Sequence, residues 1–421
     1  MSATNPVRNI VQQSHDHPVI SDLDELLHRL AALPVSSTTP YLTAYLDWRP
    51  DGDTPRLRQG VTEAGNAVAA ITSNETKRSA SLASLTGDVD AITAALQSGL
   101  DAAASGVVAV SNSAQGVLEW MPTGVPVETS VTAGPIPRLK RLAQLVEDYP
   151  VHALLQADQD TAILSFVRED LVSDTVKIRS SLYPRRQSSG GLNQRRYKAR
   201  ADERIQAFAR VIAEETRRAM EDNAVRRLIL AVSAPMEVEL RSAFHATIAD
   251  TIIGTIRIDI DAPFDEVLER ARPVGVAFER QREAEQVGEV LNALPTGNAV
   301  AGTVDVLNAL RNGQVHRLIM TRRYSEEGWI DSKMQLFGVG DPPTEHPAGG
   351  SLEDIVVVPL EEEMIRQAVQ SGSQIEIVKG SLAVDANAPI PAAGQEAPRN
   401  ELVQPLDELG GVAAMLRFAI G

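Results

Sequence analysis

Alternating strand and helix patterns in the middle of the chain constrain its fold more than any other feature. The run RRLILAVS, residues 226–233, is a short and largely apolar segment of the kind that forms a strand buried on both faces. A long helical pattern, roughly Asp202 to Glu221, precedes it, and residues 237–252 predict another helix before the strand GTIRIDID. Strands that alternate with helices predict a mostly parallel sheet covered by helices on both faces.

Two further regions flank this one and combine helices with strands in the same way. On the N-terminal side, a polar tail to about residue 20, which we expect to be mobile, precedes an amphipathic helix over 21–33 and a strand over 41–48. On the C-terminal side, two helical patterns stop at Gly313 and Gly372, and a strand-like run follows each glycine.

The length of 421 residues and this order of elements predict three α/β domains. We place the first at 1–147, after the N-terminal tail, the second at 148–271 and the third at 272–421. The final apolar run, GGVAAMLRFAIG, predicts that a core strand closes the third domain.

Composition and missing motifs exclude several classes of chemistry. The chain has no cysteine, which rules out disulfides, thiolate catalysis and cysteine zinc sites, and its seven histidines lack metal-binding spacing. The sequence contains no GxxxxGK[ST] phosphate loop, no GxGxxG after a strand and no GxSxG elbow. We therefore expect neither a metal nor a cofactor. No window reaches the roughly 18 apolar residues that a membrane span needs, so we expect a cytoplasmic protein.

Two pairs of acidic residues raise the alternative of metal chemistry. Asp158 with Asp160, and Asp259 with Asp261, could hold metal ions at a sheet edge, as two-metal nucleases do. Both pairs lie where we expect turns or strand ends, and acidic residues are common in turns. We therefore expect solvated turns at both places.

The segment PRRQSSGGLNQRRYKAR, residues 184–200, is the strongest functional feature. It has no acidic residue, although the whole chain has a net charge of −16. Clustered like charges destabilise a protein unless an anion screens them, and phosphate suits the planar donor fork of arginine. Adjacent glycines between a strand and a helix indicate a mobile loop that approaches a partner closely. We expect contact with nucleic-acid phosphates, the alternative being a flexible surface connection. The candidate contact residues are Arg185, Arg186, Arg195, Arg196, Lys198 and Arg200.

The run GGLNQRRYKARADERIQAFARVIAE, residues 190–214, resembles the catalytic loop and following helix of the eukaryotic and archaeal class-I translation termination factors and their Pelota relatives. In that family a Gly-Gly-Gln tripeptide is followed by Arg, an aromatic residue and a long helix. Residues 304–320 and 410–420 resemble parts of the family's third domain, so the resemblance covers about residues 148–421. The positions that match in the first run are Gly190, Gly191, Arg196, Tyr197, Arg210, Ala213 and Glu214.

Two departures separate this chain from the termination factors. The third position of the tripeptide is Leu192, whereas release factors have a glutamine that helps to place the attacking water. Leu192 offers only its backbone N–H, and Gln194 could replace the missing side chain only in a reshaped loop. The chain also lacks an Asn-Ile-Lys-Ser motif and, having no cysteine, the Cys-containing stop-codon motif. We therefore expect no stop-codon reading.

The remaining likeness is to the bacterial branch of this family, which includes Balon-type hibernation factors. The resemblance implies an RNase H-like middle domain and a C-terminal domain similar to the L7Ae fold. It implies binding to rRNA in the A site of the bacterial 70S ribosome, with the GTPase elongation factor Tu as a candidate partner. The loop expected to reach the peptidyl transferase centre consists of Ser189, Gly190, Gly191, Leu192, Asn193 and Gln194.

Two functions of different classes follow from this resemblance. The first is a non-catalytic ribosome-binding protein whose N-terminal domain occupies the decoding region while its basic loop blocks the peptidyl transferase centre. The second is a peptidyl-tRNA hydrolase that acts in ribosome rescue, with Gln194 or a backbone N–H positioning water. Leu192 favours the non-catalytic function.

Overall fold

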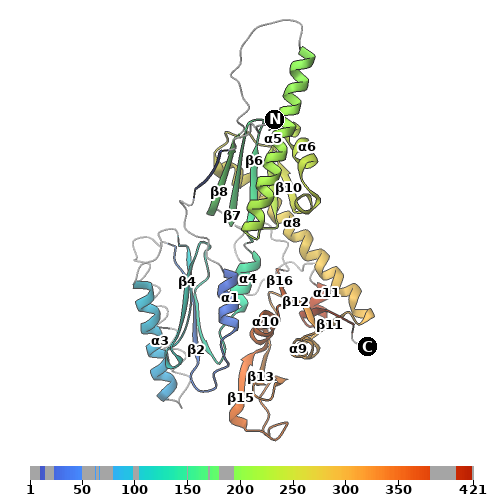
Figure 1. Cartoon of the computed structure of the whole chain (residues 1–421). Helices are drawn as coiled ribbons and strands as arrows, with labels where there is room; N and C mark the ends of the chain where they lie inside the picture. The colour runs from blue at the N-terminus through green and yellow to red at the C-terminus, as the bar shows by residue number, and fades with distance from the viewer. Residues whose placement is uncertain are drawn as a thin grey trace, which may run out of the picture. The chain divides into compact units, whose positions relative to one another are not determined.

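The computed structural model divides the chain into two compact units (Figure 1). The first contains Met1–Ile20 and Tyr149–Gln281, and the second contains Ser21–Asp148 and Arg282–Gly421. The predicted second domain corresponds largely to the first unit, and the other two predicted domains form the second unit together. The structure describes residues 10–14, 23–49, 62, 66, 79–97, 104–148, 150–168, 171–179, 194–379 and 404–419.

A six-stranded sheet forms the centre of the first unit, in the order β1-β8-β7-β6-β9-β10. The pairs β1–β8, β8–β7 and β7–β6 are antiparallel, whereas β6–β9 and β9–β10 are parallel. The strands are β1 (Ile10–Ser14), β6 (His152–Ala157), β7 (Thr161–Arg168), β8 (Leu171–Arg179), β9 (Leu228–Val232) and β10 (Ile252–Ile256).

This sheet corrects two predictions. It is mixed and not mostly parallel, because the turn between Ala157 and Thr161 is too short for the crossover that parallel neighbours need. The N-terminal tail was expected to be mobile up to residue 20, but Ile10–Ser14 forms an edge strand paired with β8. The strand order is compatible with the RNase H-like middle domain that the resemblance implies.

Helices cover both faces of this sheet, as predicted. Phe208 and Ile212 of α5 (Gln194–Asp222) pack with Leu155 on one face. Val267 of α8 (Phe264–Ala293) packs with Leu154 on the other face. Adjacent residues of β6 point to opposite faces, as side chains in a strand do.

The helix predicted over 237–252 is interrupted in the structure. It consists of α6 (Ala234–Ala243) and α7 (Ala246–Ala249), followed by β10. Phe244 and His245 have extended backbone angles, and the His245 side chain accepts a hydrogen bond from the N–H of Thr247. This local cap starts α7 and ends the continuity of the predicted helix. The predicted domain boundary at residue 272 falls inside α8, which is one continuous helix.

The N-terminal part of the second unit is an antiparallel sheet in the order β4-β3-β2-β5. Leu42 and Leu46 pack against the helix α3, whereas Tyr45, on the opposite face of β2, donates its hydroxyl to the carbonyl of Arg138 at 2.6 Å. The elements are α1 (Leu23–Ala31), β2 (Tyr41–Asp47), α3 (Ser79–Gln97), β3 (Gly106–Asn112), β4 (Val117–Thr123), β5 (Ser130–Gly134) and α4 (Lys140–Asp148). The helix and strand predicted over 21–33 and 41–48 are thus confirmed.

The C-terminal part of the second unit is a sheet in the order β11-β17-β12-β16. Gly313 and Gly372 have φ values of 65° and 66° directly after two helices, which confirms the predicted stops. The last strand is buried between two others and confirms the predicted closing strand. The elements are β11 (Ala299–Ala301), α9 (Thr303–Arg311), β12 (Val315–Thr321), α10 (Leu360–Gln370), β16 (Gln374–Val378), α11 (Gln404–Glu408) and β17 (Val412–Leu416).

A three-stranded antiparallel sheet extends from this part and was not predicted. Its order is β14-β13-β15, and its strands are β13 (Glu327–Asp331), β14 (Leu336–Val339) and β15 (Ile355–Pro359). At the end of β13, the buried side chain of Asp331 accepts a hydrogen bond from Nε2 of His346 at 2.9 Å. Nδ1 of His346 accepts the N–H groups of Ala348 and Gly350, which ties the loop after β14 to the sheet.

A buried carboxyl group joins the two parts of the second unit. Oε2 of Glu362, in the first turn of α10, accepts the N–H groups of Leu139 and Lys140 at 2.6 and 2.7 Å. It therefore caps the start of α4 from a segment more than two hundred residues away. Burial raises the pKa of Glu362 to about 7, against the lowering effect of these two N–H groups. The neighbouring Glu363 is paired with Arg366 on the same helix.

Candidate functional site

The predicted basic loop lies between β8 and α5. β8 ends at Arg179 and α5 begins at Gln194, so the prediction of a strand before the loop and a helix after it is confirmed. Residues 180–193 lie outside the described part of the chain. That segment contains seven of the candidate site residues, namely Arg185, Arg186, Ser189, Gly190, Gly191, Leu192 and Asn193.

The other five candidate residues are helical, which corrects the extent of the loop. The prediction let the loop run to Arg200, but the helix begins six residues earlier, at Gln194. Residues 194–200 consist of Gln, Arg, Lys and Ala apart from Tyr197, and these four residue types are good helix formers. Gln194, Arg195, Arg196, Lys198 and Arg200 therefore belong to the first two turns of α5.

The electrostatics of α5 differ between its two ends. In its last turns, Arg217 pairs with Glu214 at 2.8 Å and with Glu221, so these charges compensate one another. In the sequence of the first two turns, all charged residues are cations, and the first acid is Asp202. The N-terminus of a helix already carries positive partial charge, which these cations reinforce. This arrangement favours an anionic partner at the start of α5.

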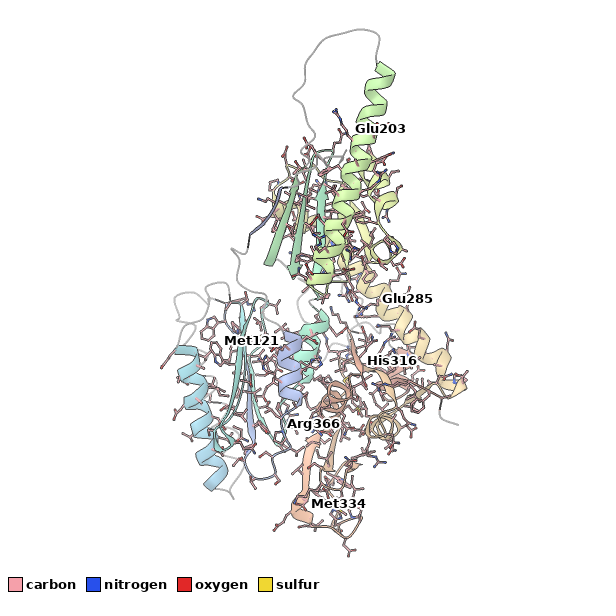
Figure 2. All side chains as sticks on the ribbon, viewed as in Figure 1. Met121, Glu203, Glu285, His316, Met334 and Arg366 are labelled. Carbon is pink, nitrogen blue, oxygen red and sulfur yellow. The ribbon has the colours of Figure 1, made fainter. Side chains whose placement is uncertain are left out.

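Buried packing fixes both elements that hold the loop. On α5, Phe208 is 3% exposed and packs with Ile212 in the core of the first unit, while Glu203, nearer the helix start, is exposed (Figure 2). On β8, Val176 and Ile178 are buried, and Lys177 between them is exposed. The elements on both sides of the loop are therefore anchored in the core, and Lys177 lies on an exposed position of β8.

The two acidic pairs come together at one end of the sheet, which sequence reasoning missed. Asp158, Asp160, Asp259 and Asp261 all line a pocket of about 850 Å³ beside the carboxyl ends of β6, β9 and β10. Each pair still forms a turn, since Asp158 accepts the N–H of Asp160 at 2.9 Å and Asp259 accepts that of Asp261 at 3.1 Å. Burial and a hydrogen bond with Asp158 raise the pKa of Asp160. The signal in the sequence was that each pair follows a strand of the same sheet.

In the part of the chain that the structure describes, no group of three or more His, Cys, Asp or Glu residues could hold a metal ion. None of the described helices is long and apolar enough to cross a membrane. The distinctive feature is thus the run of cations that begins on β8 and continues into α5.

Comparisons with known proteins agree with this geometry. Residues 137–275, which include α4, α5, α6, α7, the start of α8 and all strands of the central sheet except β1, match the family described as bacterial archaeo-eukaryotic release factor family 10. Over these residues, the expected resemblance to the bacterial branch is confirmed. Curated proteins give no match to the chain.

Several solved structures of translation factors are similar over nearly the full length. The archaeal translation termination factor aRF1 is 17% identical, with 95% of this chain and 99% of that chain covered and a TM-score of 0.26. Archaeoglobus fulgidus Pelota is 14% identical, with 100% and 98% covered and a TM-score of 0.31. S. cerevisiae Dom34 is 9% identical, with 98% of each chain covered and a TM-score of 0.42. Likeness at such low TM-scores does not assign a fold, which the strands and helices themselves establish as α/β.

Proposed function

We propose that this protein is a release-factor-like translation factor that binds the bacterial 70S ribosome, because residues 137–275 match bacterial archaeo-eukaryotic release factor family 10. The observation that carries the proposal is the run of cations at the start of α5, on a helix whose last turns are internally compensated. rRNA supplies a dense array of phosphates to which arginine donates in a bidentate way. The protein occupies the A site, and the loop between β8 and α5 enters the peptidyl transferase centre.

In this proposal the bound protein silences translation as a hibernation factor and performs no chemistry. Leu192 lacks the amide that positions water in the release-factor loop. Gln194 is the first residue of α5, so its backbone is part of a regular helix and not of a reshaped loop. The chain also lacks the motifs for reading stop codons. A translational GTPase, elongation factor Tu, is the proposed delivery partner.

Ribosome cosedimentation over a salt series tests the binding. The quadruple variant Arg185→Ala, Arg186→Ala, Arg195→Ala and Arg196→Ala should bind more weakly, with a shallower salt dependence, because fewer counterions are released from rRNA. The matched control is Arg217→Ala with Arg218→Ala, which also removes cations from α5 but at its other end. Equal loss of binding in the two variants, or unchanged binding in the first, would show that the loop does not meet rRNA.

Peptide release separates this function from its enzymatic alternative. Ribosomes loaded with labelled peptidyl-tRNA should retain the peptide at saturating protein, while translation in the same extract stops because aminoacyl-tRNA is excluded. Leu192→Gln should restore weak release if the two glycines hold the loop in the release-factor shape. Efficient release by the unmodified protein, abolished by Gln194→Ala, would identify a peptidyl-tRNA hydrolase and reject the silencing proposal.

A further inference from the structure

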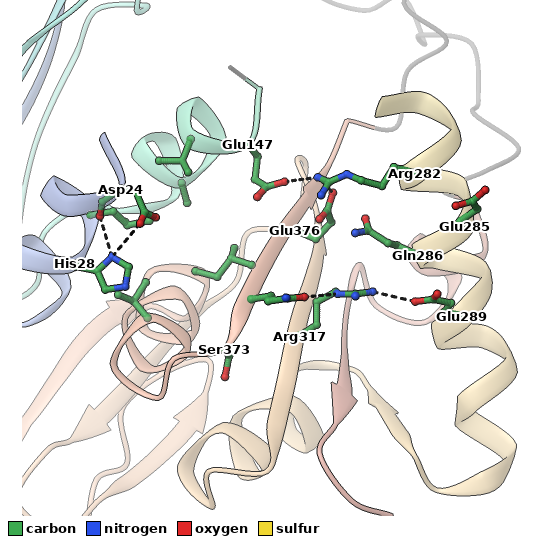
Figure 3. A pocket seen from close by; sticks show the side chains of 16 residues that line it. Asp24, His28, Glu147, Arg282, Glu285, Gln286, Glu289, Arg317, Ser373 and Glu376 are labelled. Atoms are coloured by element: carbon green, nitrogen blue, oxygen red, sulfur yellow. Dashed lines mark hydrogen bonds and ion pairs between the residues drawn. The ribbon is translucent and has the colours of Figure 1, made fainter. Parts of the chain in front are cut away.

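The second unit contains a pocket of about 590 Å³ that the proposed ribosome contacts do not use (Figure 3). Its walls come from α1, α4, α10, β12, β16 and the part of α8 that begins at Arg282, so both parts of the unit contribute. Small-molecule sites in proteins commonly have volumes of about 300–1,000 Å³, and this pocket falls within that range.

The pocket has an excess of negative charge. Its lining includes five carboxylates and two guanidinium groups, a formal charge of −3 when the histidine is neutral. Arg282 lies 2.8 Å from Glu147 and 2.9 Å from Glu376, so one cation bridges two acids. Arg317 pairs with Glu289 at 3.0 Å. The whole lining therefore favours a cation over an anion. The five acids are Asp24, Glu147, Glu285, Glu289 and Glu376.

The side-chain carbonyl oxygen of Gln286, Oε1, is buried in the same pocket and accepts no hydrogen bond from the described residues. Gln286 is only 8% exposed, and Figure 3 shows its amide pointing from α8 towards the strand that carries Glu376. A buried carbonyl without a donor costs about 1–3 kcal/mol, so a ligand that donates an N–H would relieve this cost.

Part of the pocket wall is apolar. Leu27, Ala143, Val146, Val369 and Ile375 contribute aliphatic surface to the lining. The pocket thus combines an excess of carboxylates, a buried acceptor and an aliphatic surface. A ligand that fits all three has several positive charges, N–H donors and methylene groups between them. The carboxylates belong to four separate elements, α1, α4, α8 and β16, so a ligand with charges spaced along a chain fits better than a single ammonium group.

We propose that this pocket binds an aliphatic polyamine, with its ammonium groups beside the carboxylates, an N–H donated to Oε1 of Gln286 and its methylene groups on the apolar wall. The same chemistry is present in a lysine side chain of a partner protein. A free polyamine and a lysine-rich peptide are therefore compared in the test.

Calorimetric titration of the full chain with spermidine, in the absence of ribosomes and at about 0.15 M salt, tests the proposal. Binding should saturate at one site, and Gln286→Leu should weaken it by about tenfold because a hydrogen bond to a charged donor is lost. Gln286→Glu keeps an acceptor and adds charge, so it should tighten binding. This gain cannot arise from a folding defect. Asp259→Asn, in the acidic pocket of the first unit, is the matched control and should change nothing.

Each possible outcome decides the proposal. Saturable binding that weakens in Gln286→Leu and tightens in Gln286→Glu supports the proposal. Mg²⁺ at equal charge should then compete poorly with spermidine, because the site selects a ligand that donates an N–H. Three results would each overturn the proposal. They are the absence of saturable spermidine binding, Mg²⁺ binding as tight as that of spermidine, and a loss of spermidine binding caused by Asp259→Asn alone. Tighter binding of the lysine-rich peptide than of spermidine would reject the free polyamine as the ligand.

Discussion

Replacing Glu362 with glutamine should change how the stability of the second unit depends on pH. Glu362 is fully buried, and its Oε2 caps α4 by accepting the N–H groups of Leu139 and Lys140. A glutamine carbonyl can accept the same two hydrogen bonds without carrying a charge. The charged and titratable groups around it are Arg138, Lys140, Glu361 and the phenol of Tyr45.

The magnitude follows from the pKa. Burial raises the pKa of Glu362 from 4.5 to about 7, so the folded protein holds a proton that the unfolded chain releases between these values. A raised carboxyl pKa means that stability is highest below the unfolded value and falls as the pH rises through the folded value. At about 1.4 kcal/mol per pH unit, the loss above pH 7 is about 3 kcal/mol. Glu362→Gln removes this loss, because the amide does not ionise.

Thermal unfolding of both proteins between pH 5 and 8.5 provides the assay. The difference between the two midpoints should be smallest at pH 5 and should grow until the variant is more stable at pH 8.5, by roughly 6–12 °C if each kcal/mol shifts the midpoint by about 2–4 °C. The difference between the two proteins cancels the contributions of other titrating groups. Glu345→Gln, at an exposed position, is the control and should follow the unmodified protein. A difference that stays constant across this range would refute the raised pKa. A variant that is less stable at pH 8.5 would show that the carboxylate is the favoured cap.

Three further predictions concern the core, a loop and the chemistry. Phe208→Ala should destabilise the first unit by about 3–5 kcal/mol by leaving a cavity, whereas Val238→Ala, at an exposed position on α6, should barely shift thermal unfolding. If both variants melt alike, Phe208 is not a core residue. His346→Ala removes three hydrogen bonds that hold the loop after β14, so hydrogen exchange of residues 341–350 should accelerate, and unchanged protection would show that the loop is held by other contacts. The unmodified protein should inhibit translation without releasing peptide, as measured with labelled peptidyl-tRNA.

Local patterns in the sequence predicted those elements whose apolar residues repeat regularly. Strands over 41–48 and 226–233 and the helices that stop at Gly313 and Gly372 were confirmed for this reason. The direction of strand pairing was not predictable in the same way, because it depends on which segments meet in space. β1 was missed because Ile10–Ser14 is short and mostly polar.

The candidate site, like the fold, could be predicted from the sequence only in part. The cationic run and the family resemblance could be read from the sequence because they are contiguous in it. The helical start at Gln194 was missed because the adjacent glycines led us to extend the loop too far. The pocket around Gln286 draws its lining from segments between Asp24 and Glu376, and no local pattern joins them.

The position of the last strand has a consequence for how the protein is made. β17 lies between β11 and β12, so the sheet of the second unit lacks an inner strand until residues 412–416 have been synthesised. Before that point β11 has no partner within its sheet, and one edge of β12 is open to wrong pairing. The nascent chain can complete this sheet only after residue 416 has been synthesised. Products that end before residue 412 should therefore be substrates for chaperones and proteases, whereas β6 to β10 of the first unit are already synthesised by residue 256.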